Sequence, residues 1–261
     1  MKKVLAAICF VLFCHGFAFA AHPLITDDTG TQGEGKFQLE INGEVTHDKE
    51  TTDGVTTKEK GGEAAAAISY GITDDIDVVI GVPYQWKEVK EDDAVASDND
   101  GISDVSIELK WRFFERDGFS FGLKPAVILP TGDENKGLGN GKASYGATFI
   151  ATKEAEPLTF HLNLAYTRNE YKLQEDEAAN RKDIWHASLA MEAEIIENLR
   201  AVGNIGIEKN PDKASNTDPA FILAGIIYSV TEDFDIDLGV KTGLNKPETD
   251  YSILAGIALR F

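Results

Sequence analysis

Residues 234–244 read Phe234-Asp-Ile-Asp-Leu-Gly-Val-Lys-Thr-Gly-Leu244, in which mostly apolar side chains alternate with charged residues and glycines. Successive side chains of a β-strand point to opposite faces, so this stretch predicts a strand with one apolar face and one polar or small face. The apolar face requires a nonpolar neighbour, which is either a protein core or lipid. The rest of the sequence decides between these two environments.

The same alternation recurs in eleven other segments after residue 36. They cover residues 37–45, 64–72, 76–86, 105–113, 119–129, 145–151, 158–166, 185–195, 199–207, 220–228 and 251–261. Most are roughly 9 to 12 residues long, whereas strands of soluble proteins average about 5 to 6. A tilted strand needs about 9 to 11 residues to cross a bilayer. The segment lengths therefore favour a membrane-spanning sheet.

The connections between these segments alternate between short and long. Short connections fall near residues 73–75, 115–118, 154–157, 196–198 and 231–233. Long connections fall near residues 48–61, 87–104, 130–142, 169–182, 209–218 and 245–249. Outer-membrane barrels have short periplasmic turns and longer extracellular loops, and lipid tolerates no open sheet edge. Residues 36–261 are thus predicted to form an all-β fold, a closed antiparallel transmembrane β-barrel of about 12 strands.

Aromatic residues gather at both ends of the predicted strands. Tyr70 and Phe119 stand beside short connections, and Trp185 stands beside a long one. Two such girdles mark the membrane–water interfaces of a barrel. The last segment alternates up to a terminal Phe261, which resembles the C-terminal signal of bacterial outer-membrane proteins. We therefore expect the outer-membrane assembly machinery to recognise Phe261.

Residues 1–20 have the layout of a cleaved secretory signal peptide. A basic start precedes an apolar run at residues 4–13, and a small-x-small site follows at residues 18–20. The run is shorter than the ~20 residues of a membrane-spanning helix, so it does not predict an anchor. Both cysteines, Cys9 and Cys14, lie in this segment, and the mature chain is expected to hold no disulfide. We expect export through the periplasm to the bacterial outer membrane.

The composition excludes several other classes of protein. The chain has 261 residues, with 25 Lys and Arg against 44 Asp and Glu, and its formal net charge is −19. Such acidity excludes nucleic-acid binding through phosphate neutralisation. The hydrophobic content of 43% is too high for a disordered acidic chain, and the mean hydropathy of −0.20 is too low for a bundle of membrane helices. One folded domain remains.

The alternation also assigns many charged side chains to the inside of the barrel, because lipid would penalise them. The lumen-lining candidates are Glu40, Asp77, Glu108, Lys110, Arg112, Lys124, Glu192, Arg200, Asp235, Asp237, Lys241 and Arg260. Acids and bases are nearly balanced inside, which argues against strong selectivity for anions or cations. Two interpretations stay open: the charges line water, or they pair in a network that fills the lumen.

Residues 21–35 are polar and glycine-rich, and they precede the first strand at the periplasmic side. They form either a disordered leader or a plug that folds into the lumen. In the plug interpretation, acidic and hydroxyl side chains of this segment meet inward-pointing bases. The expected contacts are those of Thr26, Asp27 and Asp28 with bases such as Arg112 or Arg260.

No sequence motif predicts a cofactor, a metal centre or catalytic residues with any force. Residues 137–142 lack the glycine spacing and the Ser or Thr of a phosphate-binding loop. The acidic stretch at residues 92–101 lacks the order of an EF-hand, so it is interpreted as a solvated loop, with a weak divalent-ion site as the alternative. His186 and Ser188 share a strand face, which leaves lipid hydrolysis as a minor hypothesis.

The mature chain opens with His22-Pro-Leu-Ile-Thr-Asp-Asp-Thr-Gly and contains three further stretches of the same family pattern. These stretches are Ile72-Thr-Asp-Asp-Ile-Asp77, Val82-Pro-Tyr84 and Leu129-Pro-Thr-Gly-Asp133. With the strand that ends at Phe261, they make the chain resemble the meta-pathway phenol degradation (MetA-pathway) family of bacterial outer-membrane transporter-like barrels. The resemblance implies a barrel that passes aromatic or other small apolar compounds, and it carries over no catalytic or binding residue.

The main hypothesis is therefore a passive outer-membrane channel for small hydrophobic or aromatic compounds, with no cofactor and with residues 24–35 as a gate. The alternative is a closed structural or adhesive barrel whose acidic loops act outside the cell. The expected partners are the lipid bilayer, lipopolysaccharide, the assembly machinery and a small-molecule solute. The sequence does not name the solute.

Overall fold

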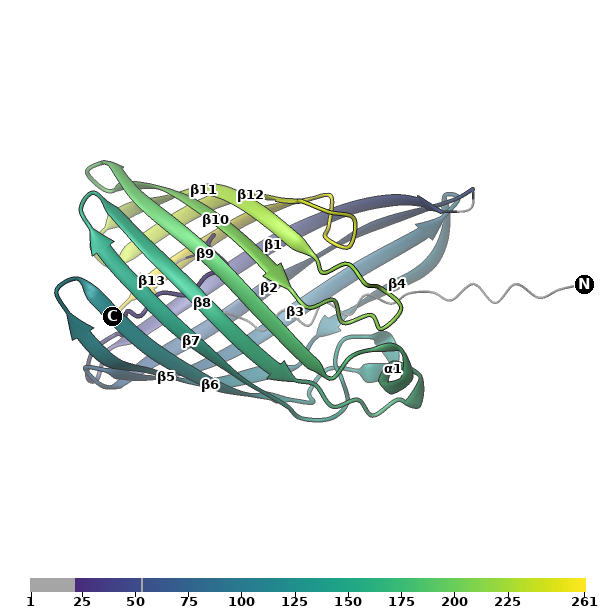
Figure 1. Cartoon of the computed structure of the whole chain (residues 1–261), viewed down its shortest axis with the longest axis horizontal. Coiled ribbons are helices and arrows are strands. Elements are labelled where there is room, and N and C mark those ends of the chain that lie inside the picture. The colour runs from purple at the N-terminus through teal and green to yellow at the C-terminus, as the bar shows by residue number, and fades with distance from the viewer. Residues whose placement is uncertain (1–21, 53) are drawn as a thin grey trace, which may run out of the picture.

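A computed structural model describes residues 22–52 and 54–261, and nearly all of its regular structure is β-strand (Figure 1). The strands are β1 (Phe37–Thr52), β2 (Val55–Thr73), β3 (Ile76–Glu91), β4 (Ala94–Ile102), β5 (Val105–Arg116), β6 (Phe119–Leu129), β7 (Ser144–Ala155), β8 (Leu158–Arg168), β9 (Asp183–Ile196), β10 (Leu199–Glu208), β11 (Ala220–Thr231), β12 (Phe234–Gly243) and β13 (Tyr251–Arg260). The predicted signal peptide at residues 1–20 lies outside the described residues.

Two short helices interrupt the connections at one end of the molecule. They are the 3-10 helix η1 (Glu134–Lys136) and the α-helix α1 (Gln174–Ala179). Within the described part of the chain, no helix is long and apolar enough to cross a membrane.

Twelve of the thirteen strands close into a barrel. Neighbouring barrel strands pair antiparallel, and β13 returns to β1 in a register that begins at Gln38 opposite Arg260. Two backbone hydrogen bonds join Phe37 and Phe261 at this seam, with N···O distances of 2.8 and 3.0 Å. The first and last strands therefore satisfy each other's backbone groups, as a hydrocarbon environment demands. This topology confirms the predicted closed antiparallel barrel.

The predicted short connections are tight turns, and they lie at the end of the barrel that also holds Phe37 and Phe261 (Figure 1). In the β5–β6 turn, Asp117 and Gly118 have φ angles of 53° and 71°. Two consecutive positive φ angles match the right-handed twist of the flanking strands, and Asp-Gly tolerates them well. This end faces the periplasm, because membrane barrels place their short turns there.

Two of the predicted long loops are strand extensions instead. β1 continues to Thr52 and β2 begins at Val55, while β3 continues to Glu91 and β4 pairs back along its upper part. The prediction of loops at residues 48–61 and 87–104 is therefore wrong. These stretches carry polar side chains on both faces because both faces lie beyond the membrane, so apolar alternation cannot reveal them. In Figure 1 the extension of β1 to β4 projects beyond the other strands.

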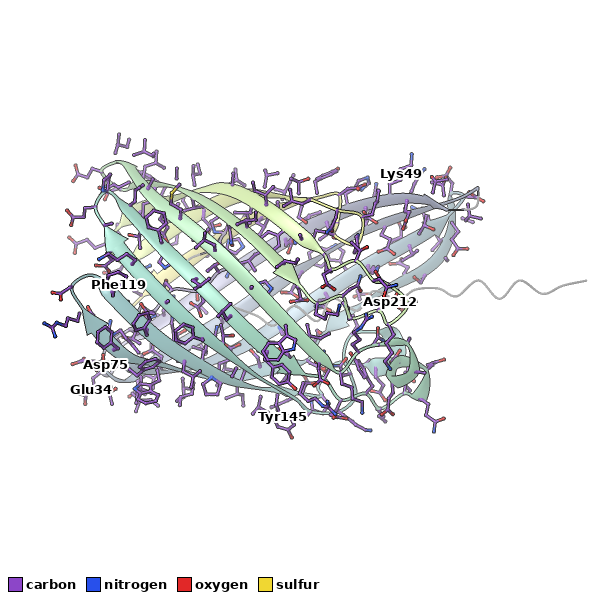
Figure 2. All side chains as sticks on the ribbon, in the orientation of Figure 1. Glu34, Lys49, Asp75, Phe119, Tyr145 and Asp212 are labelled. Atoms are coloured by element: carbon purple, nitrogen blue, oxygen red, sulfur yellow. The ribbon has the colours of Figure 1, made fainter. Side chains whose placement is uncertain are left out.

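The barrel is apolar outside and polar inside. Leu164, Leu238 and Ile253 on the outer surface are each 50% exposed, whereas Glu108 and Lys124 on the inner surface are buried. Side chains cover the outer wall along its whole length, with Phe119 toward the short-turn end and Tyr145 toward the long-loop end (Figure 2). This arrangement inverts the pattern of a soluble protein and fits a lipid-facing wall.

Candidate functional site: the occupied lumen

Residues 22–36 run through the lower half of the barrel lumen, which is the half nearer the periplasmic end. The segment starts beside β12, where His22 Nδ1 lies 2.5 Å from Asp237 Oδ1. It reaches the walls formed by β9–β11 and by β5–β6, and then returns to the periplasmic end beside β2. There Gly33 passes so close to Gly71 that a Cβ on Gly71 would overlap the Gly33 carbonyl. Glycine at position 71 is therefore required for the segment to leave the lumen at this point.

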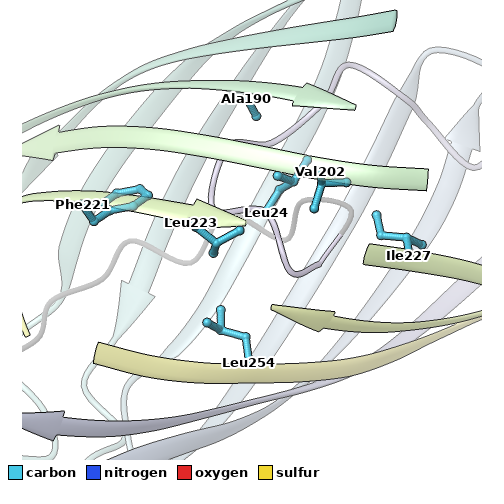
Figure 3. Packing of buried hydrophobic residues seen from close by; sticks show 7 residues of the cluster. All are labelled: Leu24, Ala190, Val202, Phe221, Leu223, Ile227 and Leu254. Atoms are coloured by element: carbon cyan, nitrogen blue, oxygen red, sulfur yellow. The ribbon is translucent and has the colours of Figure 1, made fainter. Parts of the chain in front are cut away.

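Leu24 anchors the segment through apolar packing (Figure 3). Its side chain is buried among lumen-facing residues of β9, β10, β11 and β13, which are Ala190, Val202, Phe221, Leu223, Ile227 and Leu254. Pro23 lies against Gly225 and Gly239, where an added Cβ would approach the proline ring to 2.6 and 2.7 Å. Full burial of a leucine side chain contributes about 1.5 to 3 kcal/mol. The wall thus provides a fitted apolar recess inside a mostly polar lumen.

Thr26 anchors the segment through hydrogen bonds to β9 and β10. Asn204 Oδ1 accepts from the backbone N–H groups of Ile25 and Thr26 at 2.8 and 3.1 Å. The Thr26 hydroxyl donates to Ser188 Oγ at 2.8 Å and accepts from Asn204 Nδ2 at 2.7 Å. Thr26 is fully buried, so these bonds replace the water that its polar groups lose.

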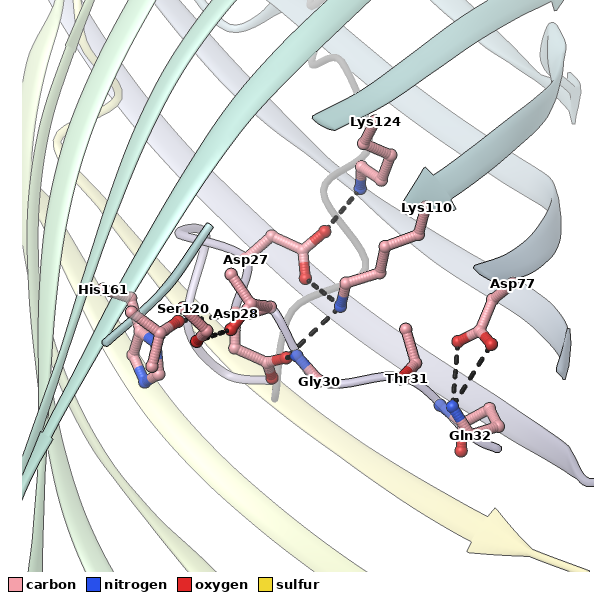
Figure 4. A network of polar contacts seen from close by, with 12 residues as sticks. Asp27, Asp28, Gly30, Thr31, Gln32, Asp77, Lys110, Ser120, Lys124 and His161 are labelled. Carbon is pink, nitrogen blue, oxygen red and sulfur yellow. Dashed lines mark hydrogen bonds and ion pairs between the residues drawn. The ribbon is translucent and has the colours of Figure 1, made fainter. Parts of the chain in front are cut away.

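Asp27 is the electrostatic centre of the segment (Figure 4). Its fully buried carboxylate lies 3.0 Å from Lys110 Nζ on β5 and 2.7 Å from Lys124 Nζ on β6. Lys124 also contacts Glu108 at 2.9 Å, and Lys110 also contacts Asp28 at 3.2 Å. Two ammonium groups and three carboxylates therefore form one connected network. Removing one partner of a buried ion pair is strongly destabilising, by about 3 to 5 kcal/mol.

The returning limb of the segment is bonded to the wall as well (Figure 4). The backbone N–H of Thr29 donates to Thr152 Oγ1 at 3.2 Å, and its hydroxyl lies 2.5 Å from Ser120 Oγ. Farther down, the N–H of Gln32 donates to the carboxylate of Asp77 at 3.0 and 3.2 Å. Residues 22–32 are thus held by packing, hydrogen bonds and ion pairs on several sides of the lumen.

The charged candidates on β9 to β13 pair with each other along the wall. Arg200 lies 2.7 Å from Glu192 and 3.6 Å from Asp235. Arg260 lies 2.8 Å from the same Asp235. Higher in the lumen, the buried Lys241 contacts Glu44 at 3.0 Å and Glu248 at 3.5 Å, and Glu40 is buried on β1. These pairs make the inner wall a charge network rather than a ring of one sign.

Asp27 and Asp28 meet inward-pointing bases as predicted, but the bases are Lys110 and Lys124, so the named examples Arg112 and Arg260 are wrong. Thr26 contacts Ser188 and Asn204 and no base. Arg112 lies at the periplasmic rim, where it contacts Asp75 of the β2–β3 turn at 2.9 Å. Lys110 is the next inward residue of β5 on the side away from the rim, and it forms the ion pairs with both aspartates instead. Alternation along a strand assigns a side chain to a face, but it does not give its height relative to another segment.

A cavity of about 560 Å³ lies between the N-terminal segment and the wall at the periplasmic end. Carboxylates and bases line it together with the buried apolar side chains of Val79 and Ile227. Cavities of this volume hold small ligands in other proteins, which range from about 300 to 1,000 Å³. The space suits one small molecule rather than a polymer.

The extracellular connections are tied to one another. Asp104, which follows β4, accepts hydrogen bonds from the N–H groups of Gly132 and Asn140, both at 2.9 Å. Arg181, which precedes β9, donates to the carbonyl groups of Asn210 at 2.9 Å and Ser215 at 3.0 Å. These bonds join the β4–β5 connection to the β6–β7 connection and the β8–β9 connection to the β10–β11 connection, so the long-loop end is an ordered surface.

Within the connection between β8 and β9, Glu170 lies 2.8 Å from Lys182 Nζ and 3.2 Å from Arg168 Nε. Hydrogen bonds from Lys182 and Arg168 hold the pKa of the Glu170 carboxyl below its usual value. The pair is partly exposed, so it orders the loop more than it stabilises the fold.

His186 and Ser188, the enzyme-like pair, take separate partners. Ser188 Oγ accepts from Thr26, and His186 Nδ1 lies 3.4 Å from Glu208 Oε2. Within the described residues this arrangement offers the serine no hydrogen bond from the histidine, which nucleophilic catalysis would need.

The contacts of Leu24, Asn204 and Ser120 were not predicted from the sequence, and Leu24 was predicted only as the first residue of the gate at residues 24–35. Leu24 and Ile25 form an apolar pair within a polar segment, which is a signal that the segment is buried. Asn204 is a polar residue at the centre of an inward strand face, where it needs a partner. Ser120 carries no comparable signal, because small polar residues are common on both faces of strand ends.

The family described as "Putative MetA-pathway of phenol degradation" matches residues 25–261. No curated protein sequence matches the chain. Among solved structures, an outer membrane channel from Pseudomonas putida F1 is similar with a TM-score of 0.70 and 13% identity, over 90% of this chain and 98% of that one. The NanC porin is similar with a TM-score of 0.57 and 10% identity, over 85% of this chain and 98% of the porin. The translocator domain of the autotransporter NalP from Neisseria meningitidis is similar with a TM-score of 0.54 and 13% identity, over 88% of this chain and 89% of that domain. These similarities show an outer-membrane β-barrel fold.

Proposed function

We propose, from the premise that the chain belongs to the MetA-pathway phenol degradation family, that it is a passive outer-membrane channel for small hydrophobic or aromatic compounds. The family match over almost the whole mature chain carries the solute class. The cavity of about 560 Å³ supports the size class, because it has room for one small molecule beside the N-terminal segment. No step in this function requires a cofactor or a catalytic residue.

The N-terminal segment is the proposed gate. Residues 24–35 occupy the lower lumen, so a solute passes only if the segment shifts or leaves a path along the wall. The apolar recess around Leu24 supports this idea, because an apolar side chain that leaves it exposes a surface that an aromatic solute can contact. Passage is then driven by the solute gradient alone, and the internally paired charges of the wall give little preference for ions of either sign.

A closed structural or adhesive barrel is the second candidate. The ion pairs of Asp27 and the tied extracellular loops support it, because both make the lumen and the outer end rigid. Lipid hydrolysis has less support, since Ser188 is engaged by Thr26 and His186 by Glu208.

The route to the membrane completes the proposal. Residues 1–20 would direct export into the periplasm and be removed there. The assembly machinery would then recognise Phe261, which stacks on Phe37 at 5.7 Å across the barrel seam. In the membrane, the apolar outer wall would contact the bilayer and the extracellular rim would contact lipopolysaccharide.

The test is uptake by liposomes that contain the purified mature protein and carry lipopolysaccharide in the outer leaflet to slow unaided entry. Entry of phenol and toluene derivatives is compared with entry of sugars and ions of similar size, against protein-free liposomes. Faster entry of the aromatics alone is the expected result. Equal entry of all solutes would make the protein a general pore, and no entry would favour the closed barrel.

A further inference from the structure

One carboxylate of the cavity at the periplasmic end has no basic partner. Glu40 lines this cavity and is only 3% exposed. Its carboxylate accepts a hydrogen bond from the side chain of Gln38, and it forms no ion pair with any residue in the ranges 22–52 and 54–261. A buried charge without a partner of opposite sign is unfavourable. Glu40 can therefore bind a positively charged group that the described part of the chain does not supply.

The other polar groups of the cavity do not meet this need. Each lysine or arginine that lines the cavity inside its rim has a carboxylate within 3.0 Å, and these residues are Lys110, Lys124, Arg200 and Arg260. Two buried acceptor atoms of the lining, Asn42 Oδ1 and Asp235 Oδ1, have no hydrogen-bond donor among the described residues. The cavity therefore has free acceptors, while its inner bases are already paired.

These acceptors surround a hollow over β13. Glu40 on β1 and Asp235 on β12 both lie opposite Ala258 of β13, one on each side. Asn42 lies opposite Gly256, which is the next inward position of β13. Neighbouring strands are about 4.8 Å apart, so the backbones of Glu40 and Asp235 are separated by about 10 Å. Because only the methyl group of Ala258 stands between them, one small group can lie between the two carboxylates.

The rest of the lining suits an apolar body and leaves a way in. Val79 on β3 and Ile227 on β11 are buried, and they line the cavity on either side of these acceptors. The volume of about 560 Å³ has room for a ring-sized group beside them. Lys36 and Asp233 also line the cavity and are exposed, so it opens at the periplasmic rim. A ligand can therefore reach the cavity without displacing the N-terminal segment.

We propose that the cavity binds small aromatic amines in their protonated form, with the ammonium group between Glu40 and Asp235. An ammonium group has three N–H donors, which match the Glu40 carboxylate, Asp235 Oδ1 and Asn42 Oδ1. Charge-assisted hydrogen bonds of this kind are stronger than those between neutral groups. A carboxylate on the solute is repelled, because the inner bases are already paired. This inference rests on the proposed function, and it specifies which aromatic solutes the channel holds most tightly.

Binding is measured by isothermal titration calorimetry on the purified mature protein in detergent at neutral pH. The probes are benzylamine, benzyl alcohol and benzoate, which have similar size and differ in charge. We expect benzylamine to bind about 10-fold more tightly than the other two, as a hydrogen bond to a charged group implies. Glu40→Gln should weaken benzylamine binding by about the same 10-fold factor, and Ala258→Leu should weaken it while keeping every charge. The control Glu232→Gln removes the same charge from an exposed position of the β11–β12 turn, and it should change binding less than about twofold.

The outcomes separate this site from the channel itself. Equal binding of the three probes would overturn the inference, because the charge of the ligand would then play no part. Equal weakening by Glu40→Gln and Glu232→Gln would also overturn it, since only net charge would matter. Toluene uptake by the liposomes described above tests the proposed function separately. Toluene entry without benzylamine binding overturns the inference alone, whereas benzylamine binding without entry of any solute supports the site and overturns the channel. Heat-dependent mobility on electrophoresis verifies that each variant is a folded barrel.

Discussion

Replacement of Asp27 by Asn should release the N-terminal segment from the lumen. The variant keeps the size of the side chain but removes the charge that Lys110 and Lys124 share at 3.0 and 2.7 Å. Breaking a buried pair costs about 3 to 5 kcal/mol. Lys110 keeps Asp28 and Lys124 keeps Glu108, so we expect the lower end of this range. A loss of about 3 kcal/mol shifts the ratio of released to seated segment by about 100-fold.

The assay is single-channel recording in planar lipid bilayers, in which seated and released segments differ in conductance. The ratio of time spent in the higher-conductance state to time spent in the lower-conductance state should rise by about the same 100-fold factor. Glu34→Gln is the control, because Glu34 belongs to the same segment, carries the same charge and is exposed. It should record like the wild-type protein. The reasoning fails if folded Asp27→Asn protein shows the wild-type conductance, or if Glu34→Gln opens the channel equally.

Three further predictions follow from the same contacts. Deletion of residues 22–35 should give a steadily higher conductance than the wild type in the same recordings, and an unchanged conductance would count against a plug. Ser188→Ala should leave the lipid hydrolysis measured with purified protein at its background, because Ser188 serves Thr26 and not a catalytic histidine; a fall would revive the hydrolase hypothesis. Because the pKa of Glu170 is lowered, its ion pair with Lys182 stabilises the β8–β9 connection fully above about pH 4.5, the usual pKa of a Glu carboxyl. This stabilisation is lost as the pH falls through the lowered pKa and Glu170 is protonated. Hydrogen exchange of residues 169–182 should therefore speed up relative to residues 245–249 between pH 5 and pH 3, beyond the intrinsic pH effect; equal changes in both loops would contradict this assignment.

The membrane-embedded part of the fold could be predicted because lipid imposes one rule on every strand. Outward positions such as Leu238 and Ile253 must be apolar, so the alternation is visible in the sequence wherever a strand crosses the hydrocarbon. Above the membrane the rule ends. Thr52, Val55 and Thr57 suit a strand, yet both faces of the extension meet water, and no periodic pattern distinguishes it from a loop.

The lumen was predictable as a list of inward charges and not as a set of contacts. Asp27 and its lysine partner on β5 are 83 residues apart in the chain, and their meeting depends on how far the segment enters the barrel. The same limit explains the error with Arg112, which has the correct face and charge but lies at the rim. The local sequence shows on which face of a strand a side chain lies, whereas the height of that side chain along the barrel axis depends on the register of the closed barrel.

A single irregularity in the β5–β6 hairpin shows how strongly the site depends on register. Arg116 lies opposite Phe119 beside the turn, and continuing that register would set Lys110 opposite Pro125 and turn Lys124 toward lipid. A bulge at Phe113 shifts the pairing by one residue, so that Lys110 and Lys124 face each other inside the barrel. Two opposed lysines in a narrow lumen repel unless a carboxylate lies between them. The bulge therefore opposes two lysines that require a carboxylate between them, and Asp27 supplies this carboxylate. This explains why the N-terminal segment packs against this wall.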